Sequence, residues 1–143
     1  MTVGFEIPGK PFGKQRPKFS RQGGFVRAVT PKETVVYENL VRMSYQEQEG
    51  RKRFGDDSMI EVVITAYYEI PKSTSKKKRA LMLEGKLRPT KKPDADNICK
   101  VICDALNGIA YRDDAAIVTA TVSKRYSENP HVEVCMWEVK GEE

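Results

Sequence analysis

The pattern of apolar and polar residues divides the chain into strand-like and helix-like segments. Runs rich in β-branched and aromatic residues predict four strands of a sheet, at residues 2–7, 59–70, 116–126 and 132–139. Turn residues at 127–130 join the last two strands, which we therefore expect to pair as a hairpin. On the last strand, Trp137 alternates with Cys135 and Val139, and we expect this face to lie in the core.

Helical patterns mark two further segments before residue 90. The first helix is expected to begin with Thr30 as N-cap, Pro31 at the first helical position and Glu33 closing a capping box, and to stop at Gly50. Its expected buried side chains are Val36, Leu40 and Met43. A short and strongly basic helix is predicted over residues 73–84.

A third helix has the clearest apolar face of the chain. Its apolar residues recur at helical spacing, namely Ile98, Val101, Ile102, Ala105, Leu106 and Ile109. We expect Asp96 to cap its N-terminus and Gly108 to follow its C-terminal end. Because helices and strands are mixed without a regular βαβ alternation, the sequence predicts an α+β fold with a small mixed β-sheet, in a single domain over residues 1–143.

Charge is distributed unevenly along this chain of net charge +5. Residues 9–29, around a Gly23-Gly24 turn, hold six basic residues and no acid, and residues 72–92 hold nine against one acid. Basic surfaces of this kind suit an anionic partner such as nucleic acid. Apolar runs are too short for a membrane span, and the N-terminus lacks a signal-peptide pattern, so a cytoplasmic protein is expected. We expect the three cysteines to be reduced, and the single histidine, His131, predicts no zinc-type ligand set.

Acidic residues are concentrated around the third helix, in the stretch KPDADNICKVICDALNGIAYRDD. In a purely structural interpretation, Asp96 is an N-cap, Lys100 is its salt-bridge partner, and Asp113-Asp114 is a solvated turn. However, Asp94 adds a carboxylate that capping does not need, and the strand after Asp114 could carry that residue back toward Asp94 and Asp96. Three carboxylates suit Mg²⁺ or Mn²⁺. Acids within a basic frame are what a metal-dependent phosphodiesterase needs, because a cation must lie between them and the polyanion.

This stretch resembles the signature of the RusA family of Holliday-junction resolvases, P-D-x-D-N-x-x-K, then a helix with D-A-L, a tyrosine and an acid pair. The basic segment before it is similar to the phage and prophage branch. The resemblance implies an Mg²⁺-dependent homodimeric endonuclease, with Mn²⁺ as a substitute and no organic cofactor. Such an enzyme nicks four-way DNA junctions symmetrically during recombination and repair.

The resemblance also assigns roles by position. Asp94 and Asp96 match the D-x-D-N acids and Lys100 the lysine, while Asp114 is the better match for the third acid and Asp113 stays possible. The three acids Asp94, Asp96 and Asp114 are expected to hold the metal, and Lys100 to orient the nucleophile or to stabilise the transition state. The candidate DNA contacts are Lys14, Arg16, Lys18, Lys76, Lys77, Lys78 and Arg79.

Three phenylalanines interleave with the N-terminal basic residues, at positions 12, 19 and 25. Stacking on open bases is one role for these rings. The expected role is packing in the core of a hairpin, which the Gly23-Gly24 turn predicts in this segment. Two other functions stay open. One is a DNA-binding protein without catalysis. The other is a D-x-D nucleotidyltransferase, although the sequence lacks the glycine-rich phosphate loop that such an enzyme should carry before its acids.

Overall fold

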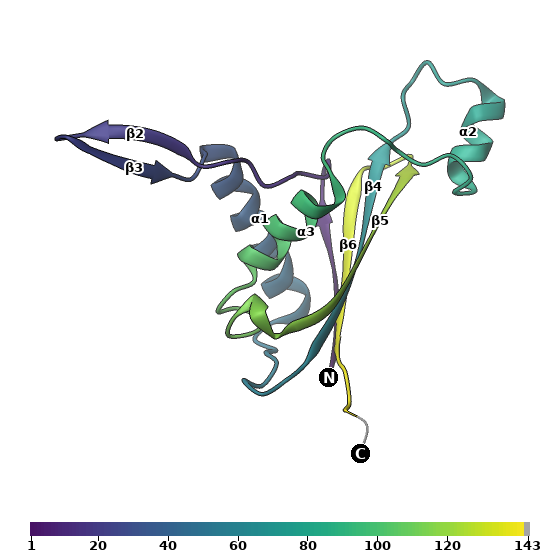
Figure 1. The fold of residues 1–143 in the computed structure, drawn as a ribbon. Coiled ribbons are helices and arrows are strands. Elements are labelled where there is room, and N and C mark those ends of the chain that lie inside the picture. The colour runs from purple at the N-terminus through teal and green to yellow at the C-terminus, as the bar shows by residue number, and fades with distance from the viewer. Residues whose placement is uncertain (142–143) are drawn as a thin grey trace.

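A four-stranded sheet with two helices on one face forms the body of the protein (Figure 1). The computed structural model describes residues 1–141, apart from the side chain of Gln22. The strands run in the order β1-β6-β4-β5, with β1 Thr2–Pro8, β6 His131–Glu138, β4 Ile60–Glu69 and β5 Ile117–Ser127. Strand β6 is antiparallel to both of its neighbours, whereas β4 and β5 are parallel. The mixed sheet and the α+β class therefore agree with the prediction.

Helices and a hairpin complete the structure, as α1 Lys32–Glu49, α2 Lys76–Leu83, α3 Ala95–Ala105, and β2 Lys18–Gln22 paired with β3 Phe25–Val29. The hairpin and α2 extend from opposite sides of the body, with α3 between them (Figure 1). A short 3-10 turn, Asp114–Ala116, leads into β5. Among the helices of residues 1–141, none has both the length and the apolar character needed to cross a membrane.

The expected hairpin between β5 and β6 is wrong, because β4 lies between them and pairs with both. The chain leaves β4, passes through α2 and α3, and returns parallel to β4 on its outer side. It then crosses the end of β4 to start β6, and the amide of Ile70 donates to the carbonyl of Ser127 there (3.1 Å). Strands two apart lie about 10 Å from each other, a distance that a three-residue connection also spans. Residues 127–130 therefore do form a turn, as predicted, but the turn does not show which strands pair.

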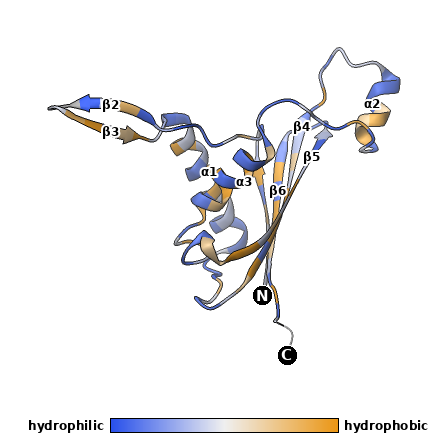
Figure 2. Cartoon of the chain, viewed as in Figure 1, coloured by the Kyte–Doolittle hydropathy of each residue, from blue (hydrophilic) through white to orange (hydrophobic). Residues whose placement is uncertain are grey.

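One face of the sheet packs against α1 and α3 and forms the core. On β6 the buried side chains are Val132, Val134 and Met136. Trp137 and Cys135 are only partly buried on the opposite face, so the expected core face of this strand is wrong. The open face of β6 also carries the polar side chains of His131 and Glu133, so the helices cover the more apolar of the two faces. Figure 2 shows hydrophobic positions along the strands of the sheet, and also on β3, away from this core.

Helix α1 is rotated relative to the expectation. It begins at Lys32, and Pro31 stands at the N-cap position without a side-chain cap, so the capping box at Thr30 is not formed. Val36 and Met43 are exposed rather than buried. The buried residues are Thr34, Tyr37, Glu38, Val41, Ser44 and Tyr45. The buried face contacts both β1 and α3 and includes polar groups. Apolar periodicity alone therefore predicted the wrong buried face for this helix.

Polar side chains at the end of α1 cover the free edge of β1. Gln48 accepts from the amide of Glu6 (2.8 Å) and donates to its carbonyl (2.7 Å), and Glu49 accepts from the amide of Gly4 (3.2 Å). An uncovered strand edge is a template for pairing with another chain. The end of α1 therefore closes this side of the sheet.

Candidate active site

The two acids of the D-x-D motif stand at the start of α3. Asp94 occupies the N-cap position, and its carbonyl accepts the amide of Ile98 (3.0 Å), but its side chain makes no capping bond. Asp96 lies within the first turn, so the expectation that Asp96 is the cap is wrong by two residues. Both side chains are exposed. Two carboxylates at the N-terminus of α3 are therefore open to a ligand.

Contacts from distant segments hold this turn in place. The hydroxyl of Tyr68 on β4 donates to the carbonyl of Pro93 (2.7 Å), and the amide of Lys14 donates to the carbonyl of Asn97 (3.0 Å). Gly13 packs so closely that a Cβ there would lie 2.8 Å from the Cβ of Pro93. Burial, followed by the charge of Asp94, raises the pKa of Tyr68 to about 12. The motif is therefore fixed from β4 on one side and from the N-terminal segment on the other.

A tight turn after α3 returns the acid pair toward the helix. The amide of Gly108 donates to the carbonyl of Tyr111 (2.7 Å), and the buried hydroxyl of Tyr111 donates back to the carbonyl of Cys103 (2.6 Å). Asn107 then accepts the amide of Asp114 (2.8 Å). The return therefore begins before the strand that was expected to make it, and it brings Asp114 beside the C-terminal half of α3.

The two members of the acid pair have different surroundings. Asp113 accepts the amide of Ala115 (2.9 Å), which lowers the pKa of its exposed carboxyl. Asp114 faces other acids, and burial first, then the hydrogen bonds that its protonated carboxyl donates to Asp113 and Asp104, raise its pKa to about 6. Asp113 thus serves the local turn, whereas Asp114 is directed at the side of α3 that carries Asp96 and Asp104. This side is called the acidic face of α3. This difference favours Asp114 over Asp113 as the third functional acid.

Cys99 lies near the acids of this face. The hydrogen bond with Cys103 lowers the pKa of the Cys99 thiol, while burial and then the carboxylates of Asp104, Asp114 and Asp96 act in the opposite direction. These three acids therefore lie around one thiol. The two sulfur atoms are 3.8 Å apart, and all three cysteines are free, as expected from the sequence.

The three proposed metal ligands, Asp94, Asp96 and Asp114, do not stand at the spacing of a single ion. Within residues 1–141, three potential ligand atoms lie within 4.8 Å of one another only at Glu6, His131 and Glu133, on another part of the sheet. The donor chemistry of Asp94, Asp96 and Asp114 nevertheless fits Mg²⁺, which prefers oxygen ligands and keeps several waters. Burial is the first cause of the raised pKa of Asp114, and the neighbouring carboxyls of Asp113 and Asp104 add to it; a divalent cation would favour the ionised form of all three.

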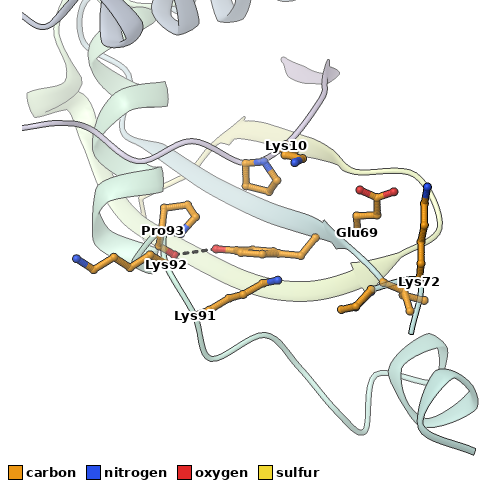
Figure 3. Close-up of a pocket in the computed structure, with 10 residues that line it drawn as sticks. Lys10, Glu69, Lys72, Lys91, Lys92 and Pro93 are labelled. Atoms are coloured by element: carbon orange, nitrogen blue, oxygen red, sulfur yellow. Dashed lines mark hydrogen bonds between the residues drawn. The ribbon is translucent and has the colours of Figure 1, made fainter. Parts of the chain in front are cut away.

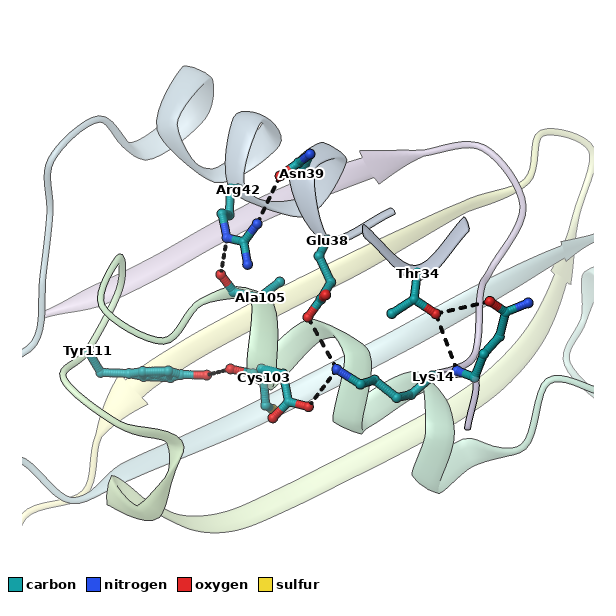
Figure 4. A network of polar contacts seen from close by, with 10 residues as sticks. Lys14, Thr34, Glu38, Asn39, Arg42, Cys103, Ala105 and Tyr111 are labelled. Carbon is teal, nitrogen blue, oxygen red and sulfur yellow. Dashed lines mark hydrogen bonds and ion pairs between the residues drawn. The ribbon is translucent and has the colours of Figure 1, made fainter. Parts of the chain in front are cut away.

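Lys14 faces this acidic face rather than the solvent (Figure 4). Its Nζ lies 3.1 Å from Asp104 and 3.4 Å from Glu38. Burial alone would lower the pKa of Lys14, but the hydrogen bond to Asp104 and the charge of Glu38 outweigh it and raise the pKa. The arrangement gives Lys14 an internal role, and it makes Asp104 the link between α3 and the N-terminal segment.

We expect Lys14→Met to lower the free energy of unfolding by about 1–3 kcal/mol, because it leaves Asp104 and Glu38 without their shared cation. Urea unfolding measures this change. Lys18→Met on the exposed strand β2 is the matched control and should leave stability within about 0.5 kcal/mol. Equal stability of the two variants would contradict the internal role of Lys14.

Lys100 is exposed on α3, and its Nζ pairs with no carboxylate in the part of the chain that the structure describes. The salt bridge to Asp96 or Asp104 that a purely structural role requires is therefore not formed. Asp104 instead binds Lys14. Lys100 is thus a cation beside the acidic face that is free to meet a phosphate.

Basic residues lie on the two elements that extend from the body, the β2-β3 hairpin and α2, which are called the two arms. Lys76, Lys77 and Lys78 of α2 are exposed, and Arg79 binds Glu128 (3.0 Å). Arg16 and Lys18 are exposed at the base of the hairpin. Together these residues present cations on either side of α3.

The hairpin also carries exposed aromatic side chains. Phe19 and Phe25 are 73% and 76% exposed, so the expectation that they pack in a hairpin core is wrong. Phe12 alone packs inward, with its ring 5.1 Å from that of Tyr37. A two-stranded hairpin that extends from the body has no second layer against which to bury such rings.

A basic pocket of about 450 Å³ lies next to the D-x-D motif (Figure 3). Four lysines line it, Lys10, Lys72, Lys91 and Lys92, with Tyr68 and Pro93. The amine of Lys124 donates to the carbonyl of Lys91 (2.6 Å) and helps to hold the loop. The sequence showed a basic stretch here but did not indicate that Lys10 from the N-terminal segment joins it.

The raised pKa of Asp114 predicts a pH-dependent stability. The stabilisation from its protonated form is complete below its ordinary pKa of 3.8 and is lost as the pH rises through about 6. Solvent screening of this partly exposed group limits the effect to about 1 kcal/mol. Asp114→Asn should remove the loss between pH 4 and pH 7 in thermal unfolding. Asp113→Asn should keep most of this loss, because burial is the first cause of the raised pKa of Asp114 and Asp113 only adds to it. The same pH dependence in both variants would contradict this assignment.

Two comparisons with known proteins identify the family of this chain. The family model described as endodeoxyribonuclease RusA matches residues 8–136. The chain is also 36% identical over 141 residues to the "Uncharacterized protein YqaN" of Bacillus subtilis (strain 168), covering 97% of this chain and 98% of that protein. The matched region contains the D-x-D motif, Lys100 and Asp114. The chain therefore belongs to the RusA endodeoxyribonuclease family, whose members are nucleases that act on Holliday junctions.

Proposed function

We propose that this protein is a divalent-metal-dependent endonuclease that resolves Holliday junctions and related branched DNA by paired nicks, in recombination and repair. The observation that carries the proposal is the acidic face of α3. Asp94 and Asp96 stand free at its start, and the return turn directs Asp114 toward the same helix. Within residues 1–141, the carboxylates of Asp94 and Asp96 make no hydrogen bond or ion pair that would give them a structural role.

Asp94, Asp96 and Asp114 would hold Mg²⁺, for which Mn²⁺ could substitute. When bound, such an ion activates water and neutralises charge on the scissile phosphate. Lys100 would donate to the phosphate as its negative charge grows. Asp104, already bound to Lys14, would position the face rather than contact the substrate.

The DNA backbone would lie across both arms and the lysine pocket. Arg16, Lys18 and the lysines of α2 offer phosphate contacts that read shape rather than sequence. The exposed rings of Phe19 and Phe25 suit contact with bases that are unstacked at a branch point. A homodimer would provide two active sites, which matches the two-fold symmetry of a four-way junction.

The direct test compares an end-labelled four-way junction with a linear duplex of the same sequence, in Mg²⁺, in Mn²⁺ and in EDTA. Symmetric nicks in the junction alone, lost in EDTA, are expected. Thermal unfolding gives a second readout, since Mg²⁺ should stabilise the wild type more than Asp114→Asn at pH 7. Junction binding without cleavage in either metal would leave a DNA-binding protein whose acids are structural.

The hairpin gives a further prediction. Phe19→Ala with Phe25→Ala should weaken binding to a four-way junction by at least about 30-fold, because each stacked base contributes about 1–3 kcal/mol. Binding to linear duplex should change little, and so should the melting temperature, since both rings are exposed. Gel-shift titrations on the two DNAs measure the difference. An equal loss on both DNAs would contradict a contact specific to the branch.

A further inference from the structure

Three metal-ligand side chains meet on the sheet face that α1 and α3 leave open. Glu6 lies on β1, and His131 and Glu133 lie at the start of β6, where Glu6 pairs with Glu133 across the two strands. Nε2 of His131 is 3.3 Å from Glu133 Oε1 and 3.6 Å from Glu6 Oε1. All three ligand atoms lie within 4.8 Å of one another. This group shares no residue with the acidic face of α3.

The imidazole ring of His131 is held in one orientation. Its Nδ1 lies 2.8 Å from the carbonyl oxygen of Asn129, and because a carbonyl only accepts, Nδ1 carries the hydrogen. The ring stacks on Tyr67 of β4, with centroids 4.5 Å apart and planes 16° apart. Its side chain is only 21% exposed. Nε2 therefore points at the two carboxylates, and its lone pair in the neutral ring would face two negative charges.

Such an arrangement needs a positive group between Nε2 and the carboxylates, either a proton or a metal ion. Donors bound at about 2.0–2.2 Å in a tetrahedral zinc site lie about 3.3–3.6 Å from one another, and the two measured distances from Nε2 are 3.3 and 3.6 Å. The Nδ1 bond to a backbone carbonyl is the outer contact that orients histidine ligands. Glu6 and Glu133 remain 61% and 49% exposed on their side chains, which leaves room for ion entry and a water ligand.

We propose that Glu6, His131 and Glu133 form a binding site for a zinc-type transition-metal ion, separate from the acidic face of α3. Imidazole ligation selects Zn²⁺ over Mg²⁺. The ion links β1 to β6 at the end of the sheet where the N-terminal segment leaves β1. Tyr67, which supports the histidine, is followed by Tyr68, whose hydroxyl holds Pro93 beside Asp94. The site therefore supports the end of β4 that also positions the D-x-D motif.

The test uses the full chain after chelator treatment, titrated with Zn²⁺ or with Mg²⁺. The protein has one histidine, so its imidazole NMR signals need no assignment. We expect Zn²⁺ to move these signals and, at about 100 times its Kd, to raise the melting temperature by about 5–10 °C. Mg²⁺ at the same concentration should not move the imidazole signals.

Matched variants separate this site from the other metal-binding groups. His131→Gln and Glu133→Gln should each weaken Zn²⁺ binding at least tenfold, while Glu61→Gln, an acid on β4 outside the cluster, should not. Cys99→Ser removes the thiol pair of α3, a competing zinc site, and should leave the imidazole shift unchanged. The proposal is overturned if millimolar Zn²⁺ leaves the imidazole signals unmoved, which leaves only a protonated histidine in ion pairs. It is also overturned if Zn²⁺ stabilisation survives His131→Gln and disappears in Cys99→Ser.

Discussion

Asp96→Asn is expected to reduce junction cleavage at least about 100-fold, because it removes a charged ligand from the site where the metal would act. The amide has the size of the carboxylate, and the exposed Asp96 side chain does not cap α3, so the fold should persist. Single-turnover cleavage of a labelled four-way junction measures the loss. Binding of the same junction in Ca²⁺ or EDTA should remain within about threefold, because the proposed DNA contacts lie on other elements.

Glu47→Gln provides the matched control for this variant, since Glu47 is an exposed acid on α1 away from the site. It should cleave at the wild-type rate. Cleavage by Asp96→Asn at the same rate would contradict a catalytic role for this acid and return Asp96 to helix stabilisation. A parallel loss of binding and of melting temperature would show that the substitution acted through the fold.

Lys100→Met is expected to lower the rate of bound-substrate cleavage by about 100-fold, with a smaller change in junction affinity. The physical reason is that Lys100 is an exposed cation on the acidic face with no carboxylate partner in residues 1–141, so its charge is available to the transition state. Rates at saturating enzyme, together with Kd from gel shifts, separate the two effects.

Lys77→Met on α2 is the control that distinguishes catalysis from phosphate binding. It should raise Kd and reduce the salt dependence of binding while leaving the saturated rate unchanged. If Lys100→Met shows this same pattern, Lys100 is a backbone contact and the transition-state role is wrong. Stability should be unaffected in both variants, because both side chains are exposed.

Local structure was predictable wherever one element carried a strong pattern. The apolar face of α3 is buried as predicted at Ile98, Val101, Ile102 and Ala105. The hairpin turn at Gly23-Gly24 and the stop of α1 at Gly50 also match, because both positions have positive φ, which glycine adopts without strain. These glycines therefore marked the turn and the helix end correctly.

Pairing and orientation were less predictable, because they depend on contacts between distant segments. The turn before β6 did not show that β4 would lie between β5 and β6. Periodicity in α1 predicted a buried stripe through Val36 and Met43. The helix packs against both β1 and α3, however, and it buries Tyr37, Val41 and Tyr45 instead. An apolar pattern reports that a face can be buried, and not which neighbour covers it.

The candidate site divides in the same way. The sequence by itself indicated the D-x-D acids, Lys100 and the acid pair, because these residues form a gapped motif within one short stretch of the chain. Only the tertiary structure decided that Asp114 faces α3 while Asp113 serves its own turn, and that Lys14 binds Asp104. It also placed Glu6 beside His131, more than a hundred residues away in the chain, where the single histidine had indicated no ligand set. Charge partners of this kind depend on strand register, and register is a property of the whole sheet rather than of any one segment.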